Sequence, residues 1–299
     1  MSTLKIPTPT DFHFPSAVSS YGYYMLAPNQ WDPQGLTLDT VLRDGDGNSI
    51  GVRIEHIAGR SSQNGGDLRL TCSHSLSRTT QRMFKSQVAR MLRVDEDLTG
   101  FHRICPAARR AKFGRLIRSA TLFEDIVKTI TGCNVAWSST ITMNRLMCEH
   151  VGAGGFPTPA QLAAWEPADL KATVKVGYRA ERIVRLARAV DAGELDLAAM
   201  EDPTLDGDEL HRRLLAIYGI GEYAAGNIRH CLGRYDRVAI DSETYRHVRE
   251  KFGLTDDNIT RLNQRIIERY SAFAPYSFLV YWFELWTGYQ ATGEYHDNA

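Results

Sequence analysis

The chain has 299 residues, 43% of them apolar, and a formal net charge of zero at pH 7, which is typical of a globular protein with one large or two ordinary domains. No apolar stretch approaches the roughly 18 residues that a membrane span needs, and Pro7, Pro9 and Asp11 stand where a secretory signal would need an apolar core. We therefore expect a cytoplasmic monomer without membrane contact, nucleoid-associated if it is bacterial, whose five scattered cysteines form neither a disulfide framework nor a zinc site.

Residues 1–112 predict an antiparallel sheet with a flanking helix. Strand signals extend over residues 12–71: apolar residues alternate in 36–42 and 50–57, and a third run follows in 68–72 after a glycine-rich turn at 62–66. After Ser77 the apolar spacing becomes helical. The fold class is therefore α+β, with an N-terminal antiparallel β-sheet domain followed by a mostly α-helical body of residues 113–299.

The turn between the first two of these strands contains part of a calcium-loop pattern. Asp44, Asp46, Asn48 and Glu55 occupy its first, third, fifth and twelfth positions. Ser49 stands where such a loop needs glycine, and strands rather than helices flank it. We therefore expect no metal here or elsewhere.

Two groups of basic residues are candidates for a surface that binds nucleic acid. Residues 101–119 contain six basic side chains and no acidic one, and arginines at 179, 182, 185 and 188 recur at helical spacing. A solvated helix face is the alternative, and it is favoured for the second group.

Residues 208–232 predict two helices joined by a tight turn in which Gly219 and Gly221 flank Ile220. The glycines permit backbone conformations that would let the amides of Ile220, Gly221 and Glu222 point outward at the start of the second helix. Such an end binds phosphate, which would hold DNA without reading its sequence. The glycines alone fit an ordinary helical hairpin equally well.

Asp241 follows this hairpin after a short extended segment, residues 237–240, and it opens the next helix. Hairpin, loop and aspartate together resemble the helix-hairpin-helix DNA glycosylase superfamily, in the branch of 3-methyladenine and 8-oxoguanine glycosylases. Residues 123–140, 175–183 and 274–286 extend the resemblance over nearly the whole chain. It implies an enzyme of base excision repair whose partner is double-stranded DNA containing a damaged base.

The resemblance makes Asp241 the catalytic carboxylate. Cleavage of an N-glycosidic bond develops positive charge on the sugar, which a fixed carboxylate stabilises while it orients the attacking water. The alternative role is a helix N-cap, which aspartate often serves. Glu243 is a minor alternative for the catalytic group.

A base flipped out of the duplex is held by stacking on aromatic side chains. The candidates are Tyr223, Trp137, Tyr281 and Trp282. Tyr223 is favoured, because relatives that act on alkylated purines carry an aromatic residue there, whereas Tyr281 and Trp282 also suit a core. Asn134 matches the family's wedge, which fills the gap left by the flipped nucleotide; a helix cap is its alternative role.

Tyr223 also bears on strand cleavage. Bifunctional members carry a lysine at that position, so the resemblance implies a monofunctional enzyme that forms no Schiff base, unless Lys128 or Lys175 reaches the sugar. We expect excision of an alkylated purine; the alternatives are 8-oxoguanine excision and a non-catalytic DNA-binding protein. No cysteine follows Asp241, which excludes the family's iron-sulfur cluster, and the resemblance implies at most a monovalent cation at the hairpin.

Overall fold

The computed structural model describes residues 2–59 and 65–292. The chain forms two compact units, Met1–Leu98 with Ala111–Leu197, and Thr99–Arg110 with Ala198–Ala299. This division differs from the expected domains 1–112 and 113–299, because the first helices of the expected helical body belong to the same unit as the sheet.

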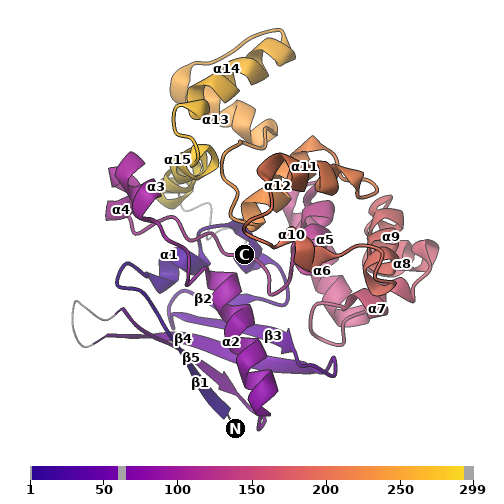
Figure 1. Ribbon diagram of the computed structural model, residues 1–299. Helices are drawn as coiled ribbons and strands as arrows, with labels where there is room; N and C mark the ends of the chain where they lie inside the picture. Colours follow the sequence, from indigo (N-terminus) through magenta and orange to yellow (C-terminus); the bar gives the residue numbers. More distant parts are fainter. Residues whose placement is uncertain (1, 60–64, 293–299) are drawn as a thin grey trace. The chain divides into compact units, whose positions relative to one another are not determined.

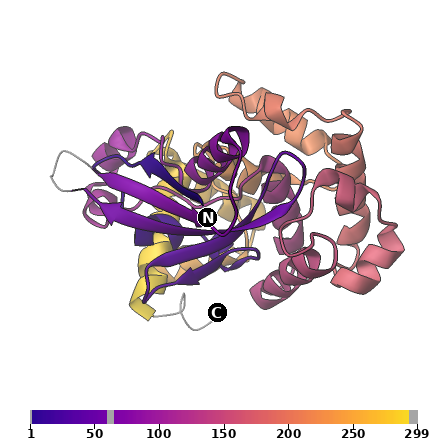
Figure 2. The same cartoon turned by 90° about the horizontal axis from the view of Figure 1, so that it is seen from below.

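The first unit contains an antiparallel sheet with the strand order β1-β5-β4-β3-β2 (Figures 1 and 2). The strands are β1 (Ser2–Pro7), β2 (Gln30–Asp32), β3 (Thr37–Arg43), β4 (Ser49–Ala58) and β5 (Gly66–Cys72). The three predicted strands are confirmed as β3, β4 and β5, each with alternate residues buried. The turn expected at 62–66 lies largely outside the described residues.

The expectation of strand structure throughout residues 12–71 was too broad. Phe14–Val18 form helix α1, with Pro15 in its first turn and the His13 side chain as its N-cap, and Gly22–Met25 form a 3-10 helix, η1. The edge strands β1 and β2 were not predicted, because β2 is short and β1 lies before residue 12, where the recognised strand signals begin.

The turn between β3 and β4 is closed by Asp44, whose carboxylate accepts hydrogen bonds from the N–H groups of Asp46 and Asn48. Strands flank it on both sides, as expected. In the described ranges 2–59 and 65–292, no group of three or more His, Cys, Asp or Glu side chains is placed to hold a metal ion.

Helix α2 (Arg78–Leu92) begins where the sequence predicts, with the Ser77 hydroxyl capping the N–H of Thr80 at 3.1 Å, and it packs against β1 (Figure 2). The rest of the first unit is helical. Its helices are α5 (Leu122–Gly132), α6 (Trp137–His150), α7 (Pro159–Ala163), α8 (Pro167–Val174) and α9 (Arg179–Asp191).

The second unit consists of helices in its described part. They are α3 (Thr99–Ile104), α4 (Pro106–Arg110), most of α10 (Leu197–Met200), α11 (Gly207–Ala216), α12 (Glu222–Cys231), α13 (Ser242–Phe252), α14 (Ile259–Ser271) and α15 (Ser277–Thr292). The hairpin predicted from the glycines is confirmed as α11 and α12, which lie side by side (Figure 1). Over the described residues, no helix combines the length and apolar character that a membrane span requires.

Candidate functional site

The turn between α11 and α12 depends on Gly219, whose φ of +81° lies in the left-handed region that glycine adopts without strain. The Ile220 N–H donates to the Ile217 carbonyl at 3.0 Å inside the turn, and the Ile220 side chain is buried. The expectation that the Ile220 amide points outward is therefore wrong, because the turn itself uses that donor.

Gly221 is the N-cap of α12 and adopts an extended conformation that provides no side-chain cap. A Cβ added here would meet no atom within 4 Å, so the start of the helix is open. Glu222 lies at the first helical position with its carboxylate 3.0 Å from His211 Nε2. The Tyr223 side chain follows and is 36% exposed. An open helix N-terminus of this kind attracts anions.

The segment that leads from α12 to Asp241 lies directly against that helix at Gly226. A Cβ at Gly226 would come within 2.8 Å of the Ala239 Cβ, so glycine is what allows the approach. The segment forms no strand: residues 236 and 237 are bends, and residues 238–240 have no regular secondary structure. Its close packing on α12 places Asp241 at a defined distance from the hairpin.

Two buried side chains of α12 hold the same segment. Arg229 is 2% exposed, and its Nη2 lies 2.6 and 2.9 Å from the two carboxylate oxygens of Asp236. His230 Nε2 lies 2.9 Å from the Arg237 carbonyl oxygen, and its ring stacks on Phe278 of α15. These bonds fix the loop that carries Asp241.

Asp241 is the N-cap of α13 and is half-buried. Its Oδ1 accepts two hydrogen bonds from Thr244, one from the backbone N–H at 2.8 Å and one from the hydroxyl at 2.9 Å. The Asp241 N–H donates to the same hydroxyl oxygen at 3.2 Å, which completes a capping box. No described residue donates to Oδ2 or forms an ion pair with this carboxylate.

Asp241 therefore does serve as a helix N-cap, the alternative role that the sequence suggested. The cap uses only Oδ1, so Oδ2 remains available to act on a substrate. Glu243 differs, since its carboxylate binds Arg246 and accepts from the Tyr289 hydroxyl at 2.6 Å. Burial acts to raise the pKa of Glu243, but these hydrogen bonds outweigh it and lower the pKa below its ordinary value. The charge of Glu243 is compensated by Arg246, so Glu243 is a poor alternative to Asp241 as the catalytic carboxylate.

Tyr281 lies beneath the surface, at 2% exposure, with its ring edge-on to His247 and Tyr270. Its hydroxyl is 2.9 Å from the Thr244 hydroxyl. The structure thus differs from the expected base-stacking role, because neighbouring aromatic rings cover the face of the phenol. Trp282 is partly exposed and stacks on Phe278, with ring centroids 5.9 Å apart.

The remaining candidates lie in the first unit. Asn134 is exposed in the loop between α5 and α6 with a φ of +52°, a conformation that asparagine tolerates. Asn134 directly follows Cys133, the C-cap of α5, and its left-handed conformation is one with which asparagine can end a helix, so the helix-cap alternative stays open beside the wedge role. Trp137, 37% exposed, lies against Gly22, where an added Cβ would come within 2.7 Å of the indole.

Each arginine of α9 has a partner within the protein. Arg179 is buried and donates through Nη2 to the carbonyls of Cys133 and Asn134. Arg185 and Arg188 pair with glutamates, and Arg182 lies over the Tyr178 ring. In the other basic group, Arg115 is buried against Asp11 and Arg118 donates to the Arg90 carbonyl. The exposed members of that group are Arg103, Arg109, Arg110 and Lys112.

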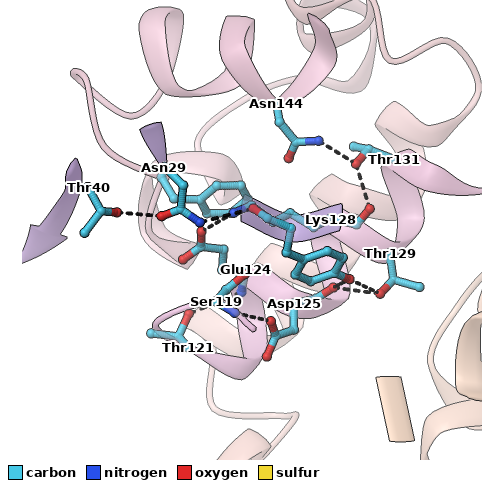
Figure 3. Close-up of polar contacts among 12 residues, drawn as sticks. Asn29, Thr40, Ser119, Thr121, Glu124, Asp125, Lys128, Thr129, Thr131 and Asn144 are labelled. Carbon is cyan, nitrogen blue, oxygen red and sulfur yellow. Dashed lines mark hydrogen bonds and ion pairs between the residues drawn. The ribbon is translucent and has the colours of Figure 1, made fainter. Parts of the chain in front are cut away.

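Lys128 is enclosed in a polar cluster of the first unit (Figure 3). Its ammonium is fully buried, 2.7 Å from the Glu124 carboxylate, and it lies near the Tyr23 and Phe156 rings. The sugar of a bound nucleotide cannot reach an ammonium that is fully buried, so Lys128 is not a candidate for Schiff-base formation. Lys175 ends α8 in the left-handed conformation, and it is exposed.

The fold matches solved structures of DNA glycosylases. The structure of MBOgg1 in complex with a low-affinity DNA ligand has a TM-score of 0.71 at 17% identity, covering 98% of this chain and 97% of that chain. The apo-form of Clostridium acetobutylicum 8-oxoguanine glycosylase/lyase has a TM-score of 0.71 at 14% identity, covering 96% of each chain. The 3-methyladenine DNA glycosylase from Archaeoglobus fulgidus has a TM-score of 0.68 at 15% identity, covering 96% of this chain and 98% of that chain.

No protein-family model and no curated protein matches the sequence. The likeness to the solved structures extends over almost the whole chain, so it confirms the predicted α+β fold with its antiparallel sheet and helical body.

Proposed function

We propose that this protein is a DNA glycosylase of base excision repair that hydrolyses the N-glycosidic bond of a damaged purine. The observation that carries the proposal is the carboxylate of Asp241, which is held at a helix N-terminus through one oxygen while the other is open. A carboxylate held in this way can stabilise the cationic sugar of the transition state, and it can orient the attacking water.

The hairpin supports DNA as the partner, which we propose the protein binds as a monomer. The open N-terminus of α12 at Gly221 and Glu222 offers amide donors and the positive end of a helix dipole, which suits a backbone phosphate, alone or with a monovalent cation. Gly226 and Arg229 fix the loop from this helix to Asp241. A phosphate bound at α12 therefore lies at a fixed distance from the catalytic oxygen.

We further propose an alkylated purine as the substrate and base release without strand cleavage. Tyr223 offers a partly exposed ring for stacking on an electron-poor alkylated base, and it has no amine for a Schiff base. Asn134, at the tip of its loop, remains the candidate for the wedge, and Trp137 and Trp282 remain candidates for further stacking contacts.

The test is a panel of duplexes that each contain one damaged base, incubated with the protein under single-turnover conditions. We expect release of an alkylated purine as free base, with an intact strand that breaks only after alkaline work-up. Release of 8-oxoguanine instead would overturn the substrate assignment. Release of no base from any duplex, with retained binding to DNA, would leave a non-catalytic DNA-binding protein.

Borohydride trapping tests the absence of lyase activity. No covalent adduct is expected, because Tyr223 has no amine and the Lys128 ammonium is fully buried and paired with Glu124. If an adduct forms, Lys175→Gln identifies whether the exposed lysine supplies the amine. An adduct at neutral pH contradicts the monofunctional assignment.

A further inference from the structure

The hydroxyl of Thr244 lies between Asp241 and Tyr281, and its hydrogen-bonding capacity is fully used. It donates to Asp241 Oδ1 at 2.9 Å and accepts from the Asp241 N–H at 3.2 Å. Its third contact is the Tyr281 hydroxyl at 2.9 Å. A hydroxyl has one proton and two acceptor lone pairs, so three contacts saturate it.

This count of one proton and two lone pairs determines which group donates in each hydrogen bond. The Thr244 hydroxyl donates its single proton to Asp241 Oδ1. The Tyr281 hydroxyl must then donate to Thr244. Burial and, after it, the negative charge of Asp241 raise the pKa of Tyr281 well above its ordinary value, which keeps the phenol protonated and able to donate.

Tyr281 of α15 is buried and closely surrounded by aromatic rings. Its ring packs against Phe278, at a centroid distance of 6.0 Å, and edge-on against His247 and Tyr270 at 5.7 and 5.5 Å. Thr244 is fully buried. The packed phenol therefore orients the Thr244 hydroxyl, and that hydroxyl, together with the Thr244 N–H, sets how the carboxylate of Asp241 is rotated.

We propose that Thr244 and Tyr281 are positioning residues for the Asp241 carboxylate: donated hydrogen bonds run from Tyr281 through Thr244 to Oδ1, which directs Oδ2 at the substrate. This inference rests on the proposed function. Both donors are neutral, so they orient the carboxylate without cancelling the charge that the sugar cation needs. Each donor also polarises the next, so the tyrosine strengthens the bond that Thr244 makes to the carboxylate.

Thr244→Val and Tyr281→Phe remove the two hydroxyls with little change in shape. We expect Thr244→Val to lower the single-turnover rate of base release about tenfold and Tyr281→Phe about threefold, from the loss of one direct and one indirect hydrogen bond to a charged group. Affinity for a duplex with an uncleavable abasic analogue should stay within about twofold, because ground-state binding does not use this chain of bonds. Thr244→Ser keeps the hydroxyl and should recover the rate.

The matched control is Tyr270→Phe. Tyr270 is equally buried and belongs to the same aromatic cluster, but its hydroxyl donates to Glu284 at 2.8 Å instead of to Thr244. This variant should keep the rate of base release, even if its melting temperature falls. An equal loss of rate in Tyr270→Phe and Tyr281→Phe would reduce Tyr281 to a general packing role and overturn the proposal.

A second measurement does not depend on activity. The side-chain carboxyl 13C resonance of Asp241, assigned by its disappearance in Asp241→Asn, should shift in Tyr281→Phe and stay in place in Tyr270→Phe. An unchanged resonance in Tyr281→Phe, or a Thr244→Ser variant as slow as Thr244→Val, contradicts the proposal. If the wild-type protein releases no base, the proposed function fails while this measurement still decides whether the hydrogen bonds exist.

Discussion

Carboxylates in the two units of the protein differ in what binds them: cations at Glu124 and Asp125 in the first unit, and neutral hydrogen-bond donors at Asp241 in the second. In the first unit, Glu124 lies 2.7 Å from Lys128, and Asp125 Oδ1 accepts from the Ser119 N–H (Figure 3). The other oxygen of Asp125, Oδ2, lies 2.9 Å from Arg90. In the second unit, Asp241 receives hydrogen bonds only from Thr244, and no described cation pairs with it.

The difference separates structural from catalytic carboxylates. The charge of a carboxylate that is paired with a buried cation is already compensated, and its burial in the core is tolerated only while that cation is present. A carboxylate held by neutral donors keeps its charge, and with one open oxygen it can act on a developing cation. The two kinds of carboxylate should therefore respond differently to mutation.

The largest expected effect is the loss of catalysis in Asp241→Asn. The rate of base release should fall by about a thousandfold or more, because the amide cannot stabilise the cationic sugar. Asparagine is as good an N-cap as aspartate, so the melting temperature should change little. Single-turnover kinetics and thermal denaturation give the two values.

Binding of abasic DNA is the control for Asp241→Asn and should stay within a few-fold of wild type. Turnover above about a hundredth of wild type would mean that Asp241 is a cap and nothing more.

Lys128→Met should have the opposite profile. It leaves Glu124 buried without a partner, which costs about 3–5 kcal/mol of unfolding free energy. The rate per folded molecule should not change. Denaturant unfolding measures the first effect, and Lys128→Met combined with Glu124→Leu should recover much of the stability. A Lys128→Met protein of normal stability that releases no base would place Lys128 in the chemistry.

Substitutions at the two hairpin glycines should have different effects, one mainly on protein stability and the other mainly on DNA binding. Gly219→Val forces a β-branched residue to a φ of +81° and should cost about 1–2 kcal/mol of stability. Gly221→Val adds a side chain where an added Cβ meets no protein atom within 4 Å, so the stability should fall only by the loss of a favourable N-cap, about 0.5–1 kcal/mol, while affinity for DNA falls about fivefold.

That loss of affinity should be equal for damaged and undamaged duplexes, because a phosphate contact carries no information about the base. Binding titrations at fixed salt concentration measure it. A change confined to the damaged duplex would move Gly221 into the base pocket.

The smallest effect concerns Glu284, a paired carboxylate within the second unit. Burial acts to raise its pKa, but hydrogen bonds from His247 and Tyr270 outweigh burial and lower the pKa below the ordinary value of 4.5. A lowered folded-state pKa contributes stability that is present above the unfolded pKa and is lost as the pH falls through the folded one.

The wild-type melting temperature should therefore decline on acidification below about pH 4.5, and Glu284→Gln should show a shallower decline. Thermal scans over that range compare the two proteins. Parallel curves would show that Glu284 contributes nothing to the pH dependence.

Local chemistry made part of this structure predictable. The helix start at Ser77, the turn with Gly219 and the N-cap at Asp241 follow from residues within one turn of each position. The alternation in β3 and β4 was equally local. The short edge strand β2 could not be predicted, because its pairing with β3 defines it as much as its own three residues do.

By itself, the sequence determined the antiparallel sheet, the helical hairpin and the carboxylate that follows it, since periodicity, turns and caps depend on near neighbours in the chain. Only the tertiary structure decided that the Ile220 amide is used inside its turn, that Lys128 is sealed and that Tyr281 serves Thr244 rather than a base. Thr244 and Tyr281 are 37 residues apart, and their contact exists only because α13 and α15 pack together. Such a contact depends on the sum of the buried surfaces around it, which no local pattern specifies.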